Sequence, residues 1–231
     1  MKKELVVLWI ALAIGIVSTI ANSLQFKEVV IVTRLLFLPL IYLYYCFKAT
    51  KISIFPSLIL GIFYATDFFN FCIKDSFMML IYLGIINYLI FLFFGIKEMT
   101  RFKLTFTNII SFFIIVSFIV FLYVNVLDIA LIELNAYKVW ISIYGITLAL
   151  SAIVASYNLN YRNRLIDLVY FFCVATFVFT DVSYLISEYY FKFPVLILIN
   201  YILQLLSYFF IVRYFLLKER YNFKKKALNH N

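Results

Sequence analysis

Two Thr-Asp pairs stand in apolar surroundings, one in "FYATDFF" (63–69) and one in "FVFTDVS" (177–183). A carboxyl group in such surroundings resists ionisation, because burial disfavours the charged form. Two acids that share one low-dielectric cavity also repel each other, so that one keeps its proton while the other is ionised. Asp67 and Asp181 are therefore predicted to work as a general acid and a general base, in either order.

The composition decides what medium surrounds these acids. Hydrophobic residues make up 66% of the 231-residue chain, and charged residues make up only 13%. A soluble domain has about 45–50% apolar and about 25% charged residues. Because no soluble fold has enough interior for this much apolar surface, the chain is predicted to lie in a lipid bilayer. The first apolar run, residues 5–24, is predicted to be a retained span rather than a cleaved signal sequence.

Polar breaks divide the chain into segments of the length that a membrane crossing needs, about 20 residues. The eight predicted spans are 5–24, 28–47, 54–73, 77–97, 105–127, 136–157, 164–187 and 194–217. Between them, only 97–103 and 158–164 are predicted to form true loops. We therefore expect an all-α polytopic bundle of eight transmembrane helices in one domain, residues 1–217, followed by a basic tail, residues 218–231.

The positive charges are divided unequally between the two sides that eight spans define. Fifteen of the twenty Lys and Arg residues fall on the side that holds both termini, and five fall on the other side. Because basic loops stay in the cytoplasm, both termini are predicted to be cytoplasmic, with the bacterial inner membrane as the simplest location. The tail stretch "KERYNFKKK" (218–226) is predicted to bind anionic lipid, so the net charge of +9 requires no nucleic acid.

The two Thr-Asp pairs belong to a longer internal similarity. In each half, Ile-Asn-Tyr follows in the next span, at Asn87 and at Asn200. Asp67 precedes Asn87 by 20 residues, and Asp181 precedes Asn200 by 19 residues. Four spans separate the copies, so both copies cross the membrane in the same direction. The pattern predicts a parallel 4+4 repeat about an axis along the membrane normal.

Six polar residues of the spans are predicted to share one layer in the outer half of the membrane. They are Arg34, Asp67, Asn87, Asp181, Tyr201 and Gln204. Four of them lie six or seven residues from the outer end of their span, or about 9–11 Å deep, and the two amides lie about one turn deeper. Intramembrane carboxylates are costly and mark functional sites, whereas Asn and Gln also join helices by hydrogen bonds. Arg34 has two possible roles, pairing with an acid or reaching outward to the membrane surface.

The sequence gives no reason to expect a metal ion or a cofactor. The one histidine, His230, lies in the tail, and the three cysteines lie in apolar runs without a Cys-x-x-Cys spacing. A retinal cofactor needs a lysine in the middle of a span, and none of the predicted spans has one. The oligomeric state is not indicated by any pattern.

These residues resemble the YhhN-like membrane proteins, whose animal members are lysoplasmalogenases. That family has eight spans, with Gly-Asp in the third, Ser-Asp in the seventh, a Tyr-x-x-Gln motif in the last and a "KPL" motif near the second. The counterparts here are "ATD" (65–67), "FTD" (179–181), "NYILQLL" (200–206) with Tyr201 and Gln204, and "TRLLFLPL" (33–40) with Arg34 and Pro39. The chain departs from the family at Thr66, which replaces the glycine, and at Asn87, which stands near the place of a histidine.

The resemblance implies hydrolysis of the vinyl ether bond of a lysoplasmalogen, or of a related lyso or ether lipid, with release of a fatty aldehyde. Asp67 and Asp181 would be the acid and the base. The substrate-binding residues that it implies are Arg34, Asn87, Tyr201 and Gln204, with Arg34 at the lipid phosphate. Two other functions stay open, a proton-coupled transporter and a non-catalytic lipid-binding membrane protein, because paired membrane acids also carry protons.

Overall fold

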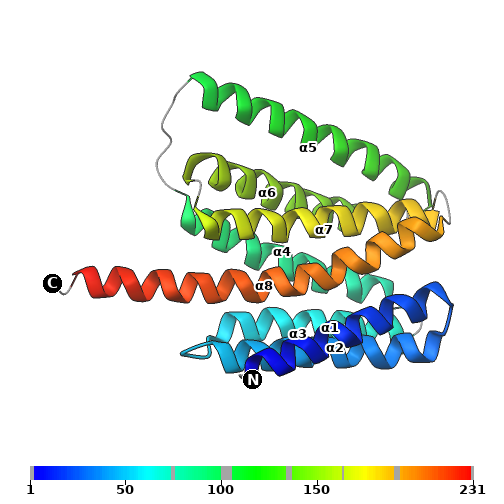
Figure 1. The fold of residues 1–231 in the computed structure, drawn as a ribbon. Helices are drawn as coiled ribbons and strands as arrows, with labels where there is room; N and C mark the ends of the chain where they lie inside the picture. Colours follow the sequence, from blue (N-terminus) through cyan, green and yellow to red (C-terminus); the bar gives the residue numbers. More distant parts are fainter. Residues whose placement is uncertain are drawn as a thin grey trace.

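The computed structural model folds as a bundle of helices, and it describes residues 3–73, 76–99, 106–133, 137–162, 164–189 and 193–229 (Figure 1). The helices are α1 (Lys3–Ser23), α2 (Lys27–Lys48), α3 (Ile54–Cys72), α4 (Phe77–Glu98), α5 (Phe106–Glu133), α6 (Lys138–Arg162), α7 (Leu165–Tyr189) and α8 (Pro194–Asn229). Each helix covers one predicted span. The all-α class is confirmed, with no strand in the described ranges.

The helices have the length and the surface of membrane spans. Seven of them, all except α5, are long and apolar enough to cross a bilayer, and in α5 the described apolar stretch is the shorter Phe112–Asn125. Large apolar side chains face outward around the bundle, for example Trp9, Ile16 and Phe113, each more than 60% exposed. In water such a surface would be strongly unfavourable. The chain is therefore an integral membrane protein.

Two groups of helices meet at α8 (Figure 1). The first group is α1, α2 and α3, which pack in sequence order, and α8 contacts all three of them. The second group is α4, α6 and α7, with α5 on the outside against α6 and α7. The most extensive helix–helix contact joins α7 to α8, and α3 packs against α4. A residue of α3 can therefore contact α8 as well as α2 and α4. A residue of α7 can contact α4 through side-chain hydrogen bonds as well as α6 and α8.

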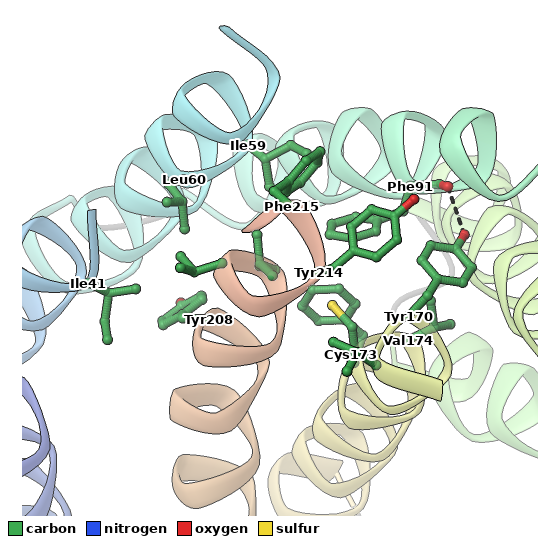
Figure 2. Close-up of a cluster of buried hydrophobic side chains, with 14 of the residues drawn as sticks. Ile41, Ile59, Leu60, Phe91, Tyr170, Cys173, Val174, Tyr208, Tyr214 and Phe215 are labelled. Carbon is green, nitrogen blue, oxygen red and sulfur yellow. Dashed lines mark hydrogen bonds between the residues drawn. The ribbon is translucent and has the colours of Figure 1, made fainter. Parts of the chain in front are cut away.

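Bulky side chains fill the space around α8 (Figure 2). Ile41 and Leu60 contribute from the first group, and Tyr208 and Phe215 contribute from α8 itself. Tyr170 of α7, on the far side of α8, donates its hydroxyl to the backbone carbonyl of Phe91 at 2.7 Å. Tyrosine is suited to such a core, because its ring packs like phenylalanine while its hydroxyl bonds a neighbouring helix.

Gly95 lets α4 approach α6 and α7 closely, and this predicts unequal effects for two glycine variants. A Cβ at Gly95 would lie 2.7 Å from Val154 Cγ1 and would press on the Tyr170 hydroxyl, whereas a Cβ at Gly61 of α3 would meet no atom within 4 Å. We expect Gly95→Ala to lower the free energy of unfolding by about 1–3 kcal/mol through overpacking. Gly61→Ala should leave it unchanged or raise it by up to about 1 kcal/mol. Thermal unfolding in detergent measures both, and equal shifts would contradict the packing.

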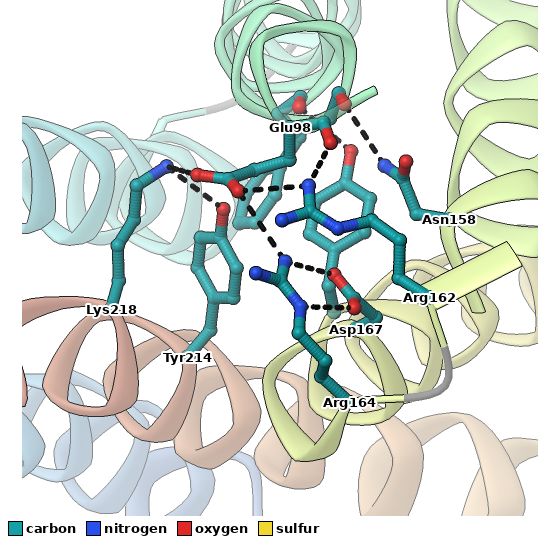
Figure 3. A network of polar contacts seen from close by, with 10 residues as sticks. Glu98, Asn158, Arg162, Arg164, Asp167, Tyr214 and Lys218 are labelled. Atoms are coloured by element: carbon teal, nitrogen blue, oxygen red, sulfur yellow. Dashed lines mark hydrogen bonds and ion pairs between the residues drawn. The ribbon is translucent and has the colours of Figure 1, made fainter. Parts of the chain in front are cut away.

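A network of charges ties the helices together at one end of the bundle (Figure 3). Glu98, the last residue of α4, pairs with Arg162 at 3.2 Å, with Arg164 at 3.4 Å and with Lys218 at 3.2 Å. Arg164 also donates two hydrogen bonds to Asp167, at 2.8 and 2.9 Å. This double hydrogen bond holds the pKa of Arg164 above its usual range, so the guanidinium stays charged. The network links α4, α6, α7 and α8.

Two segments predicted to lie outside the spans are helical. The loop prediction for 158–164 is wrong over most of its length, because α6 continues to Arg162. Long-range contacts hold this end in place, since the Asn158 amide donates to the Gly95 carbonyl at 2.9 Å and Arg162 pairs with Glu98. The segment predicted to be the basic tail continues α8 as far as Asn229, beyond the rest of the bundle in Figure 1. No glycine or proline interrupts the chain after Pro194.

Candidate functional site

The structure divides the predicted site residues between two clusters and leaves Asn87 outside both. The Asp67 cluster consists of Arg34, Asp67, Tyr201, Gln204 and Tyr208, from α2, α3 and α8. The Asp181 cluster consists of Tyr88, Tyr144 and Asp181, from α4, α6 and α7. Of the six predicted residues, four therefore lie together and Asp181 lies apart from them.

Asp67 is held by two side chains of α8. It is 2% exposed, its Oδ1 accepts a hydrogen bond from Gln204 Nε2 at 3.2 Å, and its Oδ2 accepts one from the Tyr208 hydroxyl at 3.0 Å. Gln204 and Tyr208 are one helical turn apart, so they reach the same carboxyl group from one face of α8. Gln204 Oε1 in turn accepts a hydrogen bond from Arg34 Nη2 at 2.6 Å. The glutamine is thus a bridge between the arginine and the aspartate.

Arg34 is buried in the bundle and does not reach outward. It is 1% exposed, and its Cζ lies 4.1 Å from the centroid of the Tyr201 ring. Its Nε and Nη1 have no hydrogen-bond partner among the described residues. Its charge is offset by the face of the ring and, through Gln204, by Asp67. The sequence left two roles open for Arg34, pairing with an acid or reaching outward. This geometry agrees with pairing.

Asp181 is held by two tyrosines from other helices. Its Oδ2 accepts a hydrogen bond from the Tyr88 hydroxyl at 2.5 Å and one from the Tyr144 hydroxyl at 2.8 Å, and the two hydroxyls lie 3.1 Å apart. Its Oδ1 has no hydrogen-bond partner in the described part of the chain. One carboxyl oxygen is therefore fixed by two hydrogen bonds, and the other accepts none from the described residues.

A cavity of about 690 Å³ lies between α5, α6 and α7, and Asp181 and Tyr144 form part of its wall. Most of the other lining side chains are aliphatic or aromatic, including Ile115, Phe118 and Val178. This volume is within the range of about 300–1,000 Å³ that is usual for sites of small organic ligands. None of the Asp67 cluster residues lines this cavity. Asp181 is thus an acid in the wall of an apolar chamber.

Aromatic rings connect the surroundings of the two aspartates. Phe63 and Phe177 stack with their centroids 5.3 Å apart. Phe63 also lies 5.3 Å from the Tyr208 ring, and Phe177 lies 5.6 Å from the Tyr88 ring. The two aspartates share no hydrogen-bond partner. Because benzene rings do not pass protons, this path gives the two carboxyl groups no proton relay.

Asn87 is fully buried, at 0% exposure, and neither of its amide atoms has a hydrogen-bond partner in the described ranges. It bonds neither aspartate. Its counterpart in the second half, Asn200, donates to the Thr180 carbonyl at 2.8 Å. The sequence reasoning missed three tyrosines that bind the aspartates, Tyr88, Tyr144 and Tyr208, and the first of them directly follows Asn87. The repeat carried the signal for Tyr88, because Tyr88 corresponds in "INY" to Tyr201, which was chosen as a site residue.

Comparison with protein-family models, curated proteins and solved structures gave no match to this chain. The resemblance to the YhhN-like proteins therefore rests on the short motifs around the two aspartates and in α8. No cluster of three or more His, Cys, Asp or Glu residues with the arrangement of a metal site occurs within the described residues.

Proposed function

We propose that this protein is an integral membrane hydrolase that cleaves the vinyl ether bond of a lysoplasmalogen, or of a related lyso or ether lipid. The observation that supports this most directly is the position of Asp181 in the wall of the 690 Å³ apolar cavity. Apolar walls suit a lipid chain, and a carboxylic acid is the group that vinyl ether cleavage requires. Tyr88 and Tyr144 fix one carboxyl oxygen and leave the other to the substrate.

In the proposed reaction Asp181 is protonated when the lipid binds. The electron pair of the double bond takes this proton onto the β-carbon, and the α-carbon becomes part of an oxocarbenium ion. The aspartate left behind is stabilised by the hydroxyls of Tyr88 and Tyr144 and faces the positive charge. Water then adds to the α-carbon and returns one proton to Asp181. The resulting hemiacetal breaks its bond to the former ether oxygen, which takes the hemiacetal proton, so that a fatty aldehyde and a glycerophospho-alcohol are released.

One carboxyl group completes this cycle, because it first gives a proton and then receives one. The geometry supports this scheme better than an exchange between Asp67 and Asp181, whose surroundings are linked by the rings of Phe63 and Phe177. We assign Asp67 to the pairing of Arg34 through Gln204. The substrate-binding roles expected for Arg34 and Gln204 become positioning roles within the bundle.

We also propose the parallel 4+4 repeat, with both termini in the cytoplasm. The Asp67 and Asp181 partners favour the repeat, since α3 receives Tyr208 from α8 and α7 receives Tyr88 from α4. Each aspartate is thus bound by the last helix of the other half. In this scheme Asp181, the acid of the second copy, lines the cavity and carries out the chemistry. The cytoplasmic end would be the one with the Glu98 network, and the basic end of α8 would meet anionic lipid there.

The proposed reaction predicts release of a fatty aldehyde from choline lysoplasmalogen by the purified full-length protein. The matched controls are the saturated alkyl ether and the acyl ester with the same head group, neither of which has a vinyl ether carbon to protonate. We expect aldehyde from the vinyl ether alone, measured by coupled aldehyde oxidation. If the three lipids bind equally and none is cleaved, the protein is a lipid-binding protein, and the proposed function is wrong.

A further inference from the structure

The cavity beside Asp181 is elongated along α6. The α6 residues that line it begin at Ile141 and end at Asn160. Tyr144, which bonds Asp181, and Ser156 are 12 residues apart on this lining, which corresponds to about 18 Å of helix. On α7 the lining extends from Leu185 to Phe171, and the part from Asp181 back to Phe171 is ten residues or about 15 Å. The chamber therefore extends along both helices from the acid, which lies near one end, about one turn from Ile141 and Leu185.

The polar lining groups gather at the two ends of this chamber. Asp181 and Tyr144 lie near one end, with Ile141 and Leu185 about one turn beyond them, and Ser156 and Asn160 lie at the other end. Between them, α6 presents only apolar residues to the chamber, namely Gly145, Leu148, Ala149, Ala152 and Ala155. The apolar length is close to that of one lipid chain, because a leaflet is half of a hydrocarbon core that is about 30 Å thick.

Small residues on α6 give the chamber its width. Gly145, Ala149, Ala152 and Ala155 form one side, and α5 faces them with larger residues such as Ile115 and Ile119. At the acid end, a Cβ on Gly145 would lie 2.7 Å from Cε2 of the Tyr123 ring, so this ring already closes over α6 there. Any larger side chain at the alanines would project into the chamber at a known distance from the acid.

We infer that Ala149 and Ala152 set the length of the lipid chain that this chamber accepts, with the chain running from Asp181 toward Ser156. This deepens the proposed function and rests on it for the placement of the polar end of the lipid at Asp181. Ala149 lies about 8 Å along α6 from Tyr144, and Ala152 lies about 12 Å from it. Both are only partly buried, whereas Ala155 is fully buried and a change there would disturb the core.

The test measures binding of two lipids that the proposed reaction does not cleave, octanoyl and palmitoyl lysophosphatidylcholine. Ala152→Leu should weaken binding of the palmitoyl lipid about tenfold or more, because about two or more methylene groups of its chain would no longer be buried in the chamber. It should leave binding of the octanoyl lipid within about twofold, whereas Ala149→Leu should weaken both. Ala13→Leu, the same change at an exposed position of α1, should alter neither.

Equal losses for the two lipids in Ala152→Leu would overturn the inference, and so would a loss in Ala13→Leu of the same size. If the leucine variant does not fold, Ala152→Val adds less volume. It should also weaken binding of the palmitoyl lipid more than binding of the octanoyl lipid, by a smaller factor. A chain-length effect without cleavage of lysoplasmalogen would refute the proposed function alone. Cleavage with unaltered chain selectivity in the variants would refute this inference alone.

Discussion

Asp181→Asn is expected to lower the rate of aldehyde release from lysoplasmalogen by about 10²- to 10⁴-fold, the usual contribution of a general acid. Asparagine has nearly the same shape, and its amide oxygen can still accept the hydroxyls of Tyr88 and Tyr144. It has no acidic proton for the β-carbon and no negative charge for the oxocarbenium ion. Binding of palmitoyl lysophosphatidylcholine should change by less than about threefold, because the apolar wall of the cavity is untouched.

Asp67→Asn is the matched control, since it makes the same chemical change at the other Thr-Asp pair. Per folded molecule, we expect it to keep the rate of aldehyde release within about tenfold of the wild type. Tyr144→Phe should lie between the two aspartate variants, because Tyr88 still bonds the carboxyl group. Losses of 10²-fold or more in both aspartate variants would restore the two-acid scheme. An active Asp181→Asn protein would exclude Asp181 as the acid.

The sequence predicted the eight helices well, seven of which are long and apolar enough to cross a bilayer. Long apolar runs separated by charges leave few other arrangements. It also predicted the burial of Asp67, whereas Asp181 is only partly buried and Asp167, which lies near the start of α7, is buried at 4% exposure. It did not predict that Asp67 and Asp181 have separate partners. Position along a span gives the depth of a residue, but not the direction in which its side chain points around the helix. Two residues at equal depth can therefore face different helices. Here Asp67 faces α8, whereas Asp181 faces α4.

The partners of the acids were hidden by the composition. The chain has 19 tyrosines and 28 phenylalanines, so that no single tyrosine stands out by its type. Tyr144 and Tyr208 have no motif around them, and only the packing of α6 and α8 brings them to an aspartate. The end of α6 was missed for a related reason, because Gly95 and Glu98 of α4 hold it by contacts that are distant in sequence.

Replacing either Arg34 or Asp67 alone should lower the free energy of unfolding more than replacing both together. Asp67→Leu leaves the buried charge of Arg34 without its carboxylate, and breaking a buried pair in this way costs about 3–5 kcal/mol. Arg34→Met leaves Asp67 buried with only Gln204 and Tyr208, and it should also destabilise the protein. In the double variant Arg34→Met/Asp67→Leu, two apolar side chains replace the pair, so its free energy of unfolding should return to within about 2 kcal/mol of the wild type. Reversible unfolding in mixed detergent micelles measures all four proteins.

The same double variant tests what the Asp67 cluster is for. If the cluster only holds α2, α3 and α8 together, the refolded double variant should release aldehyde at a rate close to that of the wild type. A stable but inactive double variant would instead place Arg34 or Asp67 in contact with the substrate, and the two free donors of the guanidinium would then be the binding site for its phosphate. Additive losses of stability would show that the two side chains are not coupled through Gln204. Because Asp181→Asn is expected to lower activity without touching this pair, the two experiments separate the chemistry of one aspartate from the support given by the other.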